Sequence, residues 1–196
     1  MKEKKHDIFK INHNNIKPKQ GLVLVSEPFA PDSIFSRSII LLAEHNEEGT
    51  VGFILNKPFN RKISDFSSEF GNFDINVSLG GPVSSEHIYY IHTYGNKIPG
   101  SIHIKDNLYW GGEFNVIQTM SEVGKLDEQK IRFFVGYAGW TKAQLADEIK
   151  KDYWLVSDID VKTIMRNDKK IWNKTVSELE KPYKIWQYFP ENPSLN

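Results

Sequence analysis

The sequence contains no cysteine, which excludes disulfide bonds, a thiolate nucleophile and cysteine-based zinc or iron–sulfur sites. Its 25 lysine and arginine residues equal its 25 aspartate and glutamate residues, so no net charge attracts a polyanion. No apolar run approaches the length of a membrane span, and the lysines of residues 1–20 precede no apolar run of the secretory type. We therefore expect a soluble, cytoplasmic protein that contacts neither a membrane nor nucleic acid directly.

Signatures of catalysis are also missing. The sequence has no phosphate-binding loop ending in Gly-Lys-Ser/Thr, no GxSxG or SxxK nucleophile motif and no HExxH metal motif. His87 and His92 are five residues apart, which places them on opposite faces of a strand. The sequence therefore predicts no metal site and no cofactor. It leaves open whether the protein is an enzyme, with the balance toward a non-enzymatic role.

The chain of 196 residues, 39% of them hydrophobic, is long enough for one domain with a sizeable core. We divide it into an N-terminal arm (1–19), a core (20–180) and an aromatic C-terminal tail (181–196). The arm either stays loose or docks through its isoleucines and phenylalanine. The tail is too apolar to remain in water, so we expect it to pack on the core or to form a homodimer.

Several segments have the composition of strands. Residues 21–26 and 38–45 are short runs rich in Val, Ile and Leu, typical of strands that are buried on both faces. A polar turn at 46–49 predicts a hairpin to a strand at 51–55, which Pro58 is expected to follow as a break. Further strands are predicted at 75–79, 87–92 and 131–140. Residues 60–74 are expected to form a short helix or an irregular connection.

Four helices are predicted, at 113–123, 141–151, 158–166 and 168–180. Thr141 and Gln144 have capping-box spacing at the start of the second, and the last two each begin at an aspartate. We expect Trp140 and Trp154 to hold the second helix against the sheet. Strands and helices without strict alternation predict an α+β fold with a mixed sheet.

The stretch Gly80, Gly81 and Pro82 has two interpretations. A glycine pair can present backbone N–H groups to a phosphate, or it can simply turn the chain. Pro82 has no N–H and no basic residue lies in the loop, so the bend is favoured and the anion site remains the alternative.

Polar residues at the ends of predicted central strands are candidates for a ligand site. Arg37, Glu44, His45 and Asn56 have such positions, where ligands often bind; the alternative is that Arg37 and Glu44 only form ion pairs and His45 caps a turn. If the sheet curls, strand ends bring Glu44, His45, Asn56 and His92 toward the Gly80–Pro82 turn. This hypothesis predicts one polar pocket at the rim of the sheet.

Gln144 and Glu148 lie one helical turn apart and are candidates for a surface that a protein partner recognises. The alternative is that Gln144 caps the helix and Glu148 is a solvated acid.

Three segments, in order, carry a family resemblance. They are "GLVLVSEPFAPDSIFSRSIILLAEHNEEGTVGFILNKP", "LGGPVSSEHIYYIH" and "GYAGWTKAQLADEIKKDYWL". Together they resemble the AlgH/YqgE family of bacterial proteins, over roughly residues 20 to 160. The resemblance implies a bifurcated sheet that curls into a pseudo-barrel, flanked by helices. The label "transcriptional regulator" attached to some members comes from genetics.

The family motifs fall on positions for which the resemblance implies no established catalytic role. They are Phe35, Arg37, Ser38, Glu44, His45, Gly52, Asn56, Pro58, Gly80, Gly81, Pro82, His92, Gly136, Tyr137, Trp140, Gln144, Leu145, Glu148 and Trp154. Family members often have Asp-Arg where this chain has Glu86 and His87, which weakens an anion-binding role for that turn. The aromatic tail also differs from the end of many relatives.

Two functions remain. The favoured one is a binding or regulatory protein that acts through a protein partner or a small ligand, and the alternative is a hydrolase-type enzyme with its site near His45. A direct DNA-binding regulator is disfavoured, because residues 158–180 mix acidic with basic side chains and carry no basic recognition face.

Overall fold

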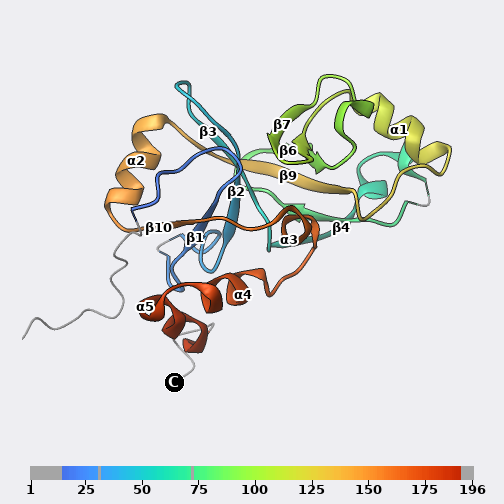
Figure 1. The fold of residues 1–196 in the computed structure, drawn as a ribbon. Coiled ribbons are helices and arrows are strands. Elements are labelled where there is room, and N and C mark those ends of the chain that lie inside the picture. The colour runs from blue at the N-terminus through green and yellow to red at the C-terminus, as the bar shows by residue number, and fades with distance from the viewer. Residues whose placement is uncertain (1–14, 31, 72, 191–196) are drawn as a thin grey trace, which may run out of the picture.

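The computed structural model describes residues 15–30, 32–71 and 73–190, and within them ten strands form one sheet (Figure 1). The main path runs β10-β1-β2-β3-β9-β6-β8-β7. Off this path, β5 pairs with β9 and β4 pairs with β5. The strands are β1 (Val23–Ser26), β2 (Ile39–His45), β3 (Thr50–Ile54), β4 (Pro58–Lys62), β5 (Asn76–Leu79), β6 (Val83–His92), β7 (Ile102–Lys105), β8 (Leu108–Trp110), β9 (Ile131–Trp140) and β10 (Trp154–Ser157).

The two unbroken apolar runs form interior strands, as the sequence predicts. All four residues of β1 and the first five of β2 are buried. β1 lies between β10 and β2, and β2 lies between β1 and β3. A strand that is buried on both faces has no side in water, so its sequence is a continuous hydrophobic run without alternating polar residues.

Strand β9 is the central strand of the sheet and pairs with three other strands. One edge of β9 pairs antiparallel with β6, whereas the other edge pairs with β3 near Trp140 and with β5 near Phe134. The sheet therefore forks at β9, and because β5 runs parallel to β9 the sheet is mixed. The α+β class and the bifurcated sheet are confirmed. Among the described strands, however, the outer edges of β10 and β7 do not pair, so the expected curl stops short of a closed barrel.

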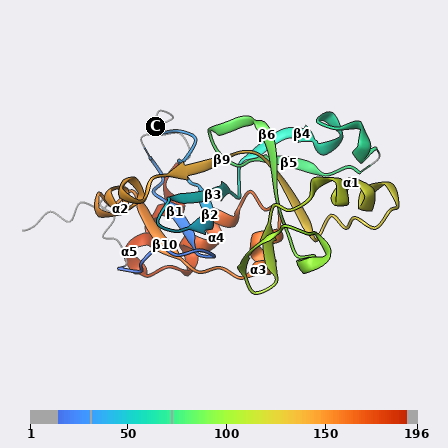
Figure 2. The same cartoon turned by 90° about the horizontal axis from the view of Figure 1, so that it is seen from above.

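The helices lie around the sheet, with α2 and α1 near opposite ends of β9 (Figure 2). They are α1 (Phe114–Glu122), α2 (Lys142–Lys150), α3 (Val161–Met165), α4 (Ile171–Glu178) and α5 (Lys181–Lys184), with 3₁₀ turns at Ile63–Asp65, Ser68–Phe70, Gly95–Lys97 and Ile185–Tyr188. None of the described helices is long and apolar enough to cross a membrane.

Local side-chain chemistry explains where the predicted helices begin. Thr141 accepts a hydrogen bond from the backbone N–H of Gln144, so this N-cap is confirmed. The third helix starts later than residue 158, because Asp160 is the side chain that accepts from Thr163. The fourth starts after Lys170, whose N–H donates to the carboxylate of Asp168.

Four strands escaped prediction. The described residues of 60–74, which are 60–71 and 73–74, contain no α-helix: Pro58 starts β4, where its missing N–H is tolerated, and 3₁₀ turns follow. The side chains of β4 are mostly exposed, so the segment lacks the alternation that identifies a strand. The other three, β7, β8 and β10, have only three or four residues each.

The largest core cluster joins the central strands to the C-terminal helices. Trp172 of α4, Tyr183 of α5 and Trp186 belong to this cluster, and Trp186 is only 2% exposed. The indole nitrogen of Trp172 donates to the carbonyl oxygen of Ser26 at 2.9 Å. The described part of the tail thus packs on the sheet. Residues 1–14 of the expected arm and 191–196 of the tail lie outside the described residues.

Candidate functional site

The predicted rim pocket between His45 and His92 does not form. His45 pairs with Thr50, and Thr50 pairs with Trp140 at one end of β9. His92 pairs with Ile131 at the other end of β9. Nine residue steps along a strand correspond to about 30 Å at about 3.3 Å per residue. The prediction that His45 and His92 converge is therefore wrong. Both histidines end a strand, but His45 lies near one end of β9 and His92 lies at the other.

Arg37 and Asn56 lie at the start of β2, away from Glu44 and His45. The Asn56 side chain accepts from the N–H of Ile39 at 3.0 Å and donates to the carbonyl of Arg37 at 2.7 Å. The Arg37 guanidinium donates to the carbonyl of Phe189 at 2.6 Å and lies 4.8 Å from the ring centroid of Trp172. These contacts give both residues a structural role: Arg37 holds the tail against the sheet, and Asn56 fixes the backbone at the start of β2.

The Gly80–Pro82 turn is a close crossing of two backbones. A Cβ atom on Gly80 would lie 2.1 Å from the carbonyl oxygen of Gly136, and one on Gly81 would lie 2.2 Å from the carbonyl carbon of Tyr137. The N–H of Gly80 already donates to the carbonyl of Val135 at 2.8 Å. The glycine pair is explained by this crossing, and the contacts favour the bend over the anion cradle.

His92 is fully buried and its ring is already hydrogen-bonded. Nδ1 accepts from the N–H of Tyr94 at 3.3 Å, so the hydrogen of the neutral ring is on Nε2, which lies 2.9 Å from the hydroxyl of Ser101. Burial lowers the pKa of His92 to about 4, partly opposed by the carbonyl of Gly111. At neutral pH His92 is therefore an uncharged part of the core.

Glu148 joins α2 to the sheet. One of its carboxylate oxygens accepts from the indole nitrogens of both Trp140 and Trp154 at 2.8 Å, and the other accepts from the side chain of Gln144 at 3.0 Å. The expected role of the two tryptophans is confirmed. Neither interpretation of Glu148 anticipated that its carboxylate would bind side chains of the same protein. Gln144 remains exposed.

Residues from separate segments do converge at the other side of this junction. A groove of about 450 Å³, here called the hairpin groove, lies between the β2–β3 hairpin and the junction of β9 with α2. Two sequence candidates, Glu44 and Gln144, line it. The full lining is Glu44, Asn46, Glu48, Gly49, Thr50, Val51, Val83, Tyr137, Gly139, Trp140, Thr141 and Gln144.

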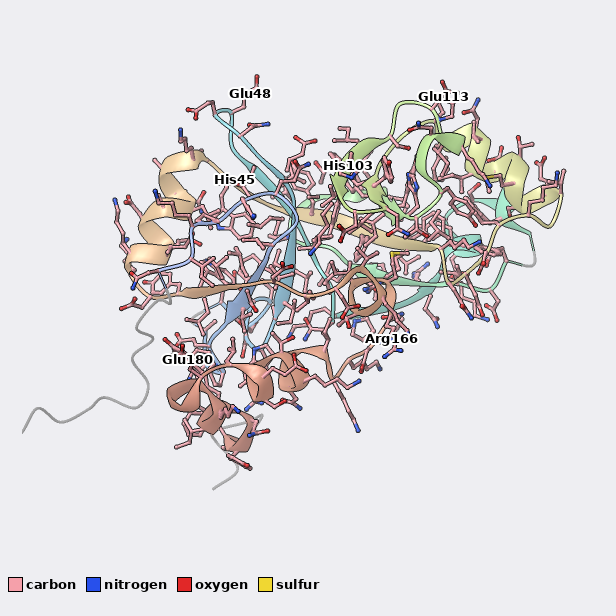
Figure 3. The ribbon with its side chains drawn as sticks, in the orientation of Figure 1. His45, Glu48, His103, Glu113, Arg166 and Glu180 are labelled. Atoms are coloured by element: carbon pink, nitrogen blue, oxygen red, sulfur yellow. The ribbon has the colours of Figure 1, made fainter. Side chains whose placement is uncertain are left out.

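The hairpin is held in place by its tip. The side chain of Asn46 accepts from the N–H groups of Glu48 and Gly49, which closes the turn. A Cβ atom on Gly49 would lie 2.7 Å from the carbonyl oxygen of Trp140, so glycine lets the tip approach the end of β9. Figure 3 shows Glu48 at the projecting tip of the hairpin, above α2.

The groove combines an acidic rim with an apolar floor. Glu44 is half-buried and Glu48 is exposed, and neither carboxylate bonds to another described residue. Glu47 differs, because it pairs with Lys142, and that ammonium lowers the pKa of Glu47. Val83 is 37% exposed on the floor. Because no described residue engages the half-buried Glu44 carboxylate, it is the acidic group that a ligand in the groove would satisfy best.

His45 lies beside the groove without lining it. Its Nδ1 is 2.7 Å from the hydroxyl of Thr50, a residue that is 4% exposed. Burial lowers the pKa of His45, and so does Lys142, whereas Glu47 opposes the shift. A neutral imidazole beside a hydroxyl has the chemistry of a base and a nucleophile, but here most of the residue that carries the hydroxyl is covered.

Comparisons with known proteins are consistent with this fold. Residues 23–184 match the protein family described as AlgH-like. The chain belongs to this family. It is 42% identical to a UPF0301 protein of Parabacteroides distasonis, with 97% of this chain and 98% of that protein covered. It is 41% identical to one of Bacteroides fragilis, with 97% of each covered.

Two solved structures have a similar fold. The AlgH protein of Pseudomonas aeruginosa superposes with a TM-score of 0.68 at 21% identity, covering 83% of this chain and 89% of that one. A protein of Corynebacterium diphtheriae superposes with a TM-score of 0.71, also at 21% identity, covering 89% of this chain and 94% of that one. At this identity the likeness shows the fold alone.

Some groove residues gave no functional signal in the sequence. Val83 and Tyr137 belong to strand segments and read as core or strand positions, and only the pairing of β6 with β9 brings both to one surface. As for metals, no group of three potential ligand side chains occurs among residues 15–30, 32–71 and 73–190.

Proposed function

We propose that this AlgH-like protein is a binding protein whose hairpin groove receives a basic segment of a protein partner. The observation that carries the proposal is Glu44, a half-buried carboxylate with no partner among the described residues, which faces a groove with an apolar floor. A carboxylate in this setting is stabilised by a cation that brings its own hydrogen-bond donors.

The lining suits a lysine or arginine side chain. The charged end of such a side chain would lie between Glu44 and Glu48, while its aliphatic stem would cover Val83 and the ring of Tyr137. An aromatic ring face adds cation–π attraction of about 0.5–1 kcal/mol at an exposed site. Acidic and apolar groups thus act on different parts of the same side chain.

The open shape of the groove suits a protein segment. Several lining residues are exposed, including Asn46, Thr141 and Gln144, so the groove lies open between a projecting hairpin and a helix. An extended segment would run along such a groove and leave at both ends.

The proposal is tested by selecting from a library of short random peptides with the full chain. We expect the selected peptides to be enriched in lysine and arginine, and to bind about tenfold more weakly to the double variant Glu44→Gln/Glu48→Gln, a loss of about 1.4 kcal/mol. The matched control is Glu122→Gln/Glu178→Gln, which removes two exposed acids elsewhere. Equal binding by wild type and the Glu44/Glu48 variant would contradict the proposal.

A hydrolase-type enzyme is the second candidate, and the 2.7 Å contact between His45 and Thr50 favours it. Phosphatase, esterase and nuclease substrates test this candidate with purified protein. We expect no turnover, because Thr50 is 4% exposed and a substrate would have to displace the surrounding strand residues. A turnover that disappears in both His45→Ala and Thr50→Ala would replace the binding function with an enzymatic one.

Direct binding to duplex DNA remains disfavoured. The buried side of α4, with Ile171, Trp172 and Val176, packs into the core. The net charge of zero gives no long-range attraction for the duplex. In a mobility-shift assay we expect no salt-dependent, sub-micromolar complex.

A homodimer through the tail, in the cytoplasm, also remains a proposal. Tyr188 is 78% exposed and Ile185 is 39% exposed, whereas Trp186 between them is buried. If the outward side chains form a dimer interface, Tyr188→Glu shifts the mass in sedimentation equilibrium from dimer to monomer.

A further inference from the structure

We propose that a second cavity, next to α3, binds a small organic phosphate. This α3 cavity has a volume of about 810 Å³, within the range of small-molecule sites. It lies between α3 with the residues after it and the beginnings of β5 and β9. Its lining is Asp74, Ile75, Asn76, Thr93, Asn107, Glu128, Gln129, Ile131, Arg132, Val161, Lys162, Met165, Arg166 and Asn167.

Two cations form one side of the α3 cavity. Lys162 lies on α3 and Arg166 is the residue that caps its C-terminus, so they are four residues apart and share a face. Both are exposed, and neither forms an ion pair with a described residue. Figure 3 shows Arg166 on the outer side of this segment. Two adjacent cations match a dianion, and the arginine fork suits phosphate oxygens in particular.

A third cation lies beneath the cavity. Arg132 is 4% exposed and donates to the carbonyl oxygens of Ile164, Arg166 and Leu55 at 2.6, 3.1 and 2.8 Å. These acceptors are uncharged, and no carboxylate of a described residue pairs with the guanidinium. A buried charge without a counter-ion attracts an anion to the adjoining space more strongly than a solvated charge does.

The acids of the lining do not cancel these cations. Asp74 already pairs with Lys62. Glu128 is exposed and is the one lining acid without a described partner, against three cations. The cavity thus has an excess of positive charge although the whole chain is neutral.

The rest of the lining fits an organic body attached to the phosphate. Four carboxamide side chains reach the cavity, and none of them bonds to another described residue: Asn76, Asn107, Gln129 and Asn167. Each offers both donors and acceptors, which suits hydroxyl groups or a heterocyclic ring. Ile75, Ile131 and Met165 supply apolar surface. A bare phosphate ion would leave all of these groups unused.

The α3 cavity is independent of the hairpin groove. Ile131 and Arg132 begin β9, whereas Trp140 ends it beside the groove. Loss of ligand binding at one site therefore leaves the other to be measured separately.

The test is isothermal titration calorimetry of the full chain with three phosphates, AMP, ribose 5-phosphate and glucose 6-phosphate, and with adenosine, ribose and glucose. We expect at least one phosphate to bind with a Kd below about 1 mM, and its dephosphorylated counterpart to bind at least about tenfold more weakly. The variant Lys162→Gln/Arg166→Gln should weaken that phosphate at least about tenfold, because it removes two charge-assisted hydrogen bonds.

The matched control is Lys150→Gln/Lys151→Gln, which removes two exposed cations at the end of α2 and should leave the Kd unchanged. The proposal is overturned if none of the three phosphates binds, if the dephosphorylated compound binds equally well, or if the Lys162/Arg166 variant binds like wild type.

Discussion

The indole nitrogen of Trp140, the last residue of β9, donates a 2.8 Å hydrogen bond to the carboxylate of Glu148 in the last turn of α2. The same oxygen accepts from Trp154 at the start of β10. One charged acceptor therefore fixes a helix to two strands. This junction also forms one wall of the hairpin groove, so its integrity determines the position of Gln144 there.

Removal of the Glu148 carboxylate should destabilise the protein. Glu148→Ala leaves two largely buried indole N–H groups without an acceptor, and we expect a loss of about 2–4 kcal/mol in the free energy of unfolding. Glu148→Gln keeps an oxygen acceptor and should lose less than half as much. Urea denaturation measures both, with Asp147→Ala as the exposed control on the same helix. A Glu148→Ala variant as stable as the control would refute the role of this carboxylate.

Stability should fall in mild acid because of His92. In the unfolded chain the pKa of a histidine is about 6.5, whereas burial lowers the pKa of His92 to about 4. The stabilising effect of the neutral ring is therefore complete above pH 6.5 and is lost as the pH falls toward 4. The shift corresponds to about 3 kcal/mol.

Urea unfolding of wild type and His92→Gln at pH 7, 5 and 4 measures this effect. The stability difference between the two should shrink as the pH falls, since the variant has no titrating ring at this position. The exposed His87, replaced by asparagine, is the control for the loss of a histidine outside the core. A constant difference between wild type and His92→Gln from pH 7 to 4 would rule out a buried neutral ring.

Arg132 should matter for stability as well as for the α3 cavity. Arg132→Met removes the donors to three carbonyl oxygens, two of them in buried hydrogen bonds, and we expect a loss of about 2–4 kcal/mol, reduced by the desolvation cost that the charge no longer incurs. Arg132→Lys restores a cation but not the forked geometry, so it should recover part of the loss. Thermal unfolding followed by far-UV circular dichroism measures both variants. Equal stability of Arg132→Met and wild type would show that the three bonds are dispensable.

The parts of the fold that the sequence predicted are those with strong local signals. Residues 22–25 and 39–43 are apolar throughout and became most of the interior strands β1 and β2. Thr141 caps α2 because the hydroxyl and the N–H it binds are only three residues apart. By contrast, β4 is exposed and β10 is short, so their pairing with distant strands leaves no periodic pattern.

The candidate site was predicted less well, because it depends on long-range pairing. Glu44 was a candidate because it is polar and ends a strand, and Gln144 because it lies one helical turn from Glu148; both line the hairpin groove. His45 and His92 had the same local features but reach opposite ends of β9, which only the strand register determines. The buried Arg132 gave no signal, since most of its acceptors are backbone carbonyls that a sequence does not distinguish.

Binding of a basic segment in the hairpin groove is the central claim, and the most direct test is amide and indole chemical-shift mapping of the ¹⁵N-labelled chain. A lysine-rich peptide from the selection is the titrant. We predict that the largest shifts fall on the groove residues 44–51, 83 and 137–144, including the indole N–H of Trp140, and that they vanish in Glu44→Gln/Glu48→Gln. Shifts confined to other surfaces, or unchanged in that variant, would contradict the account.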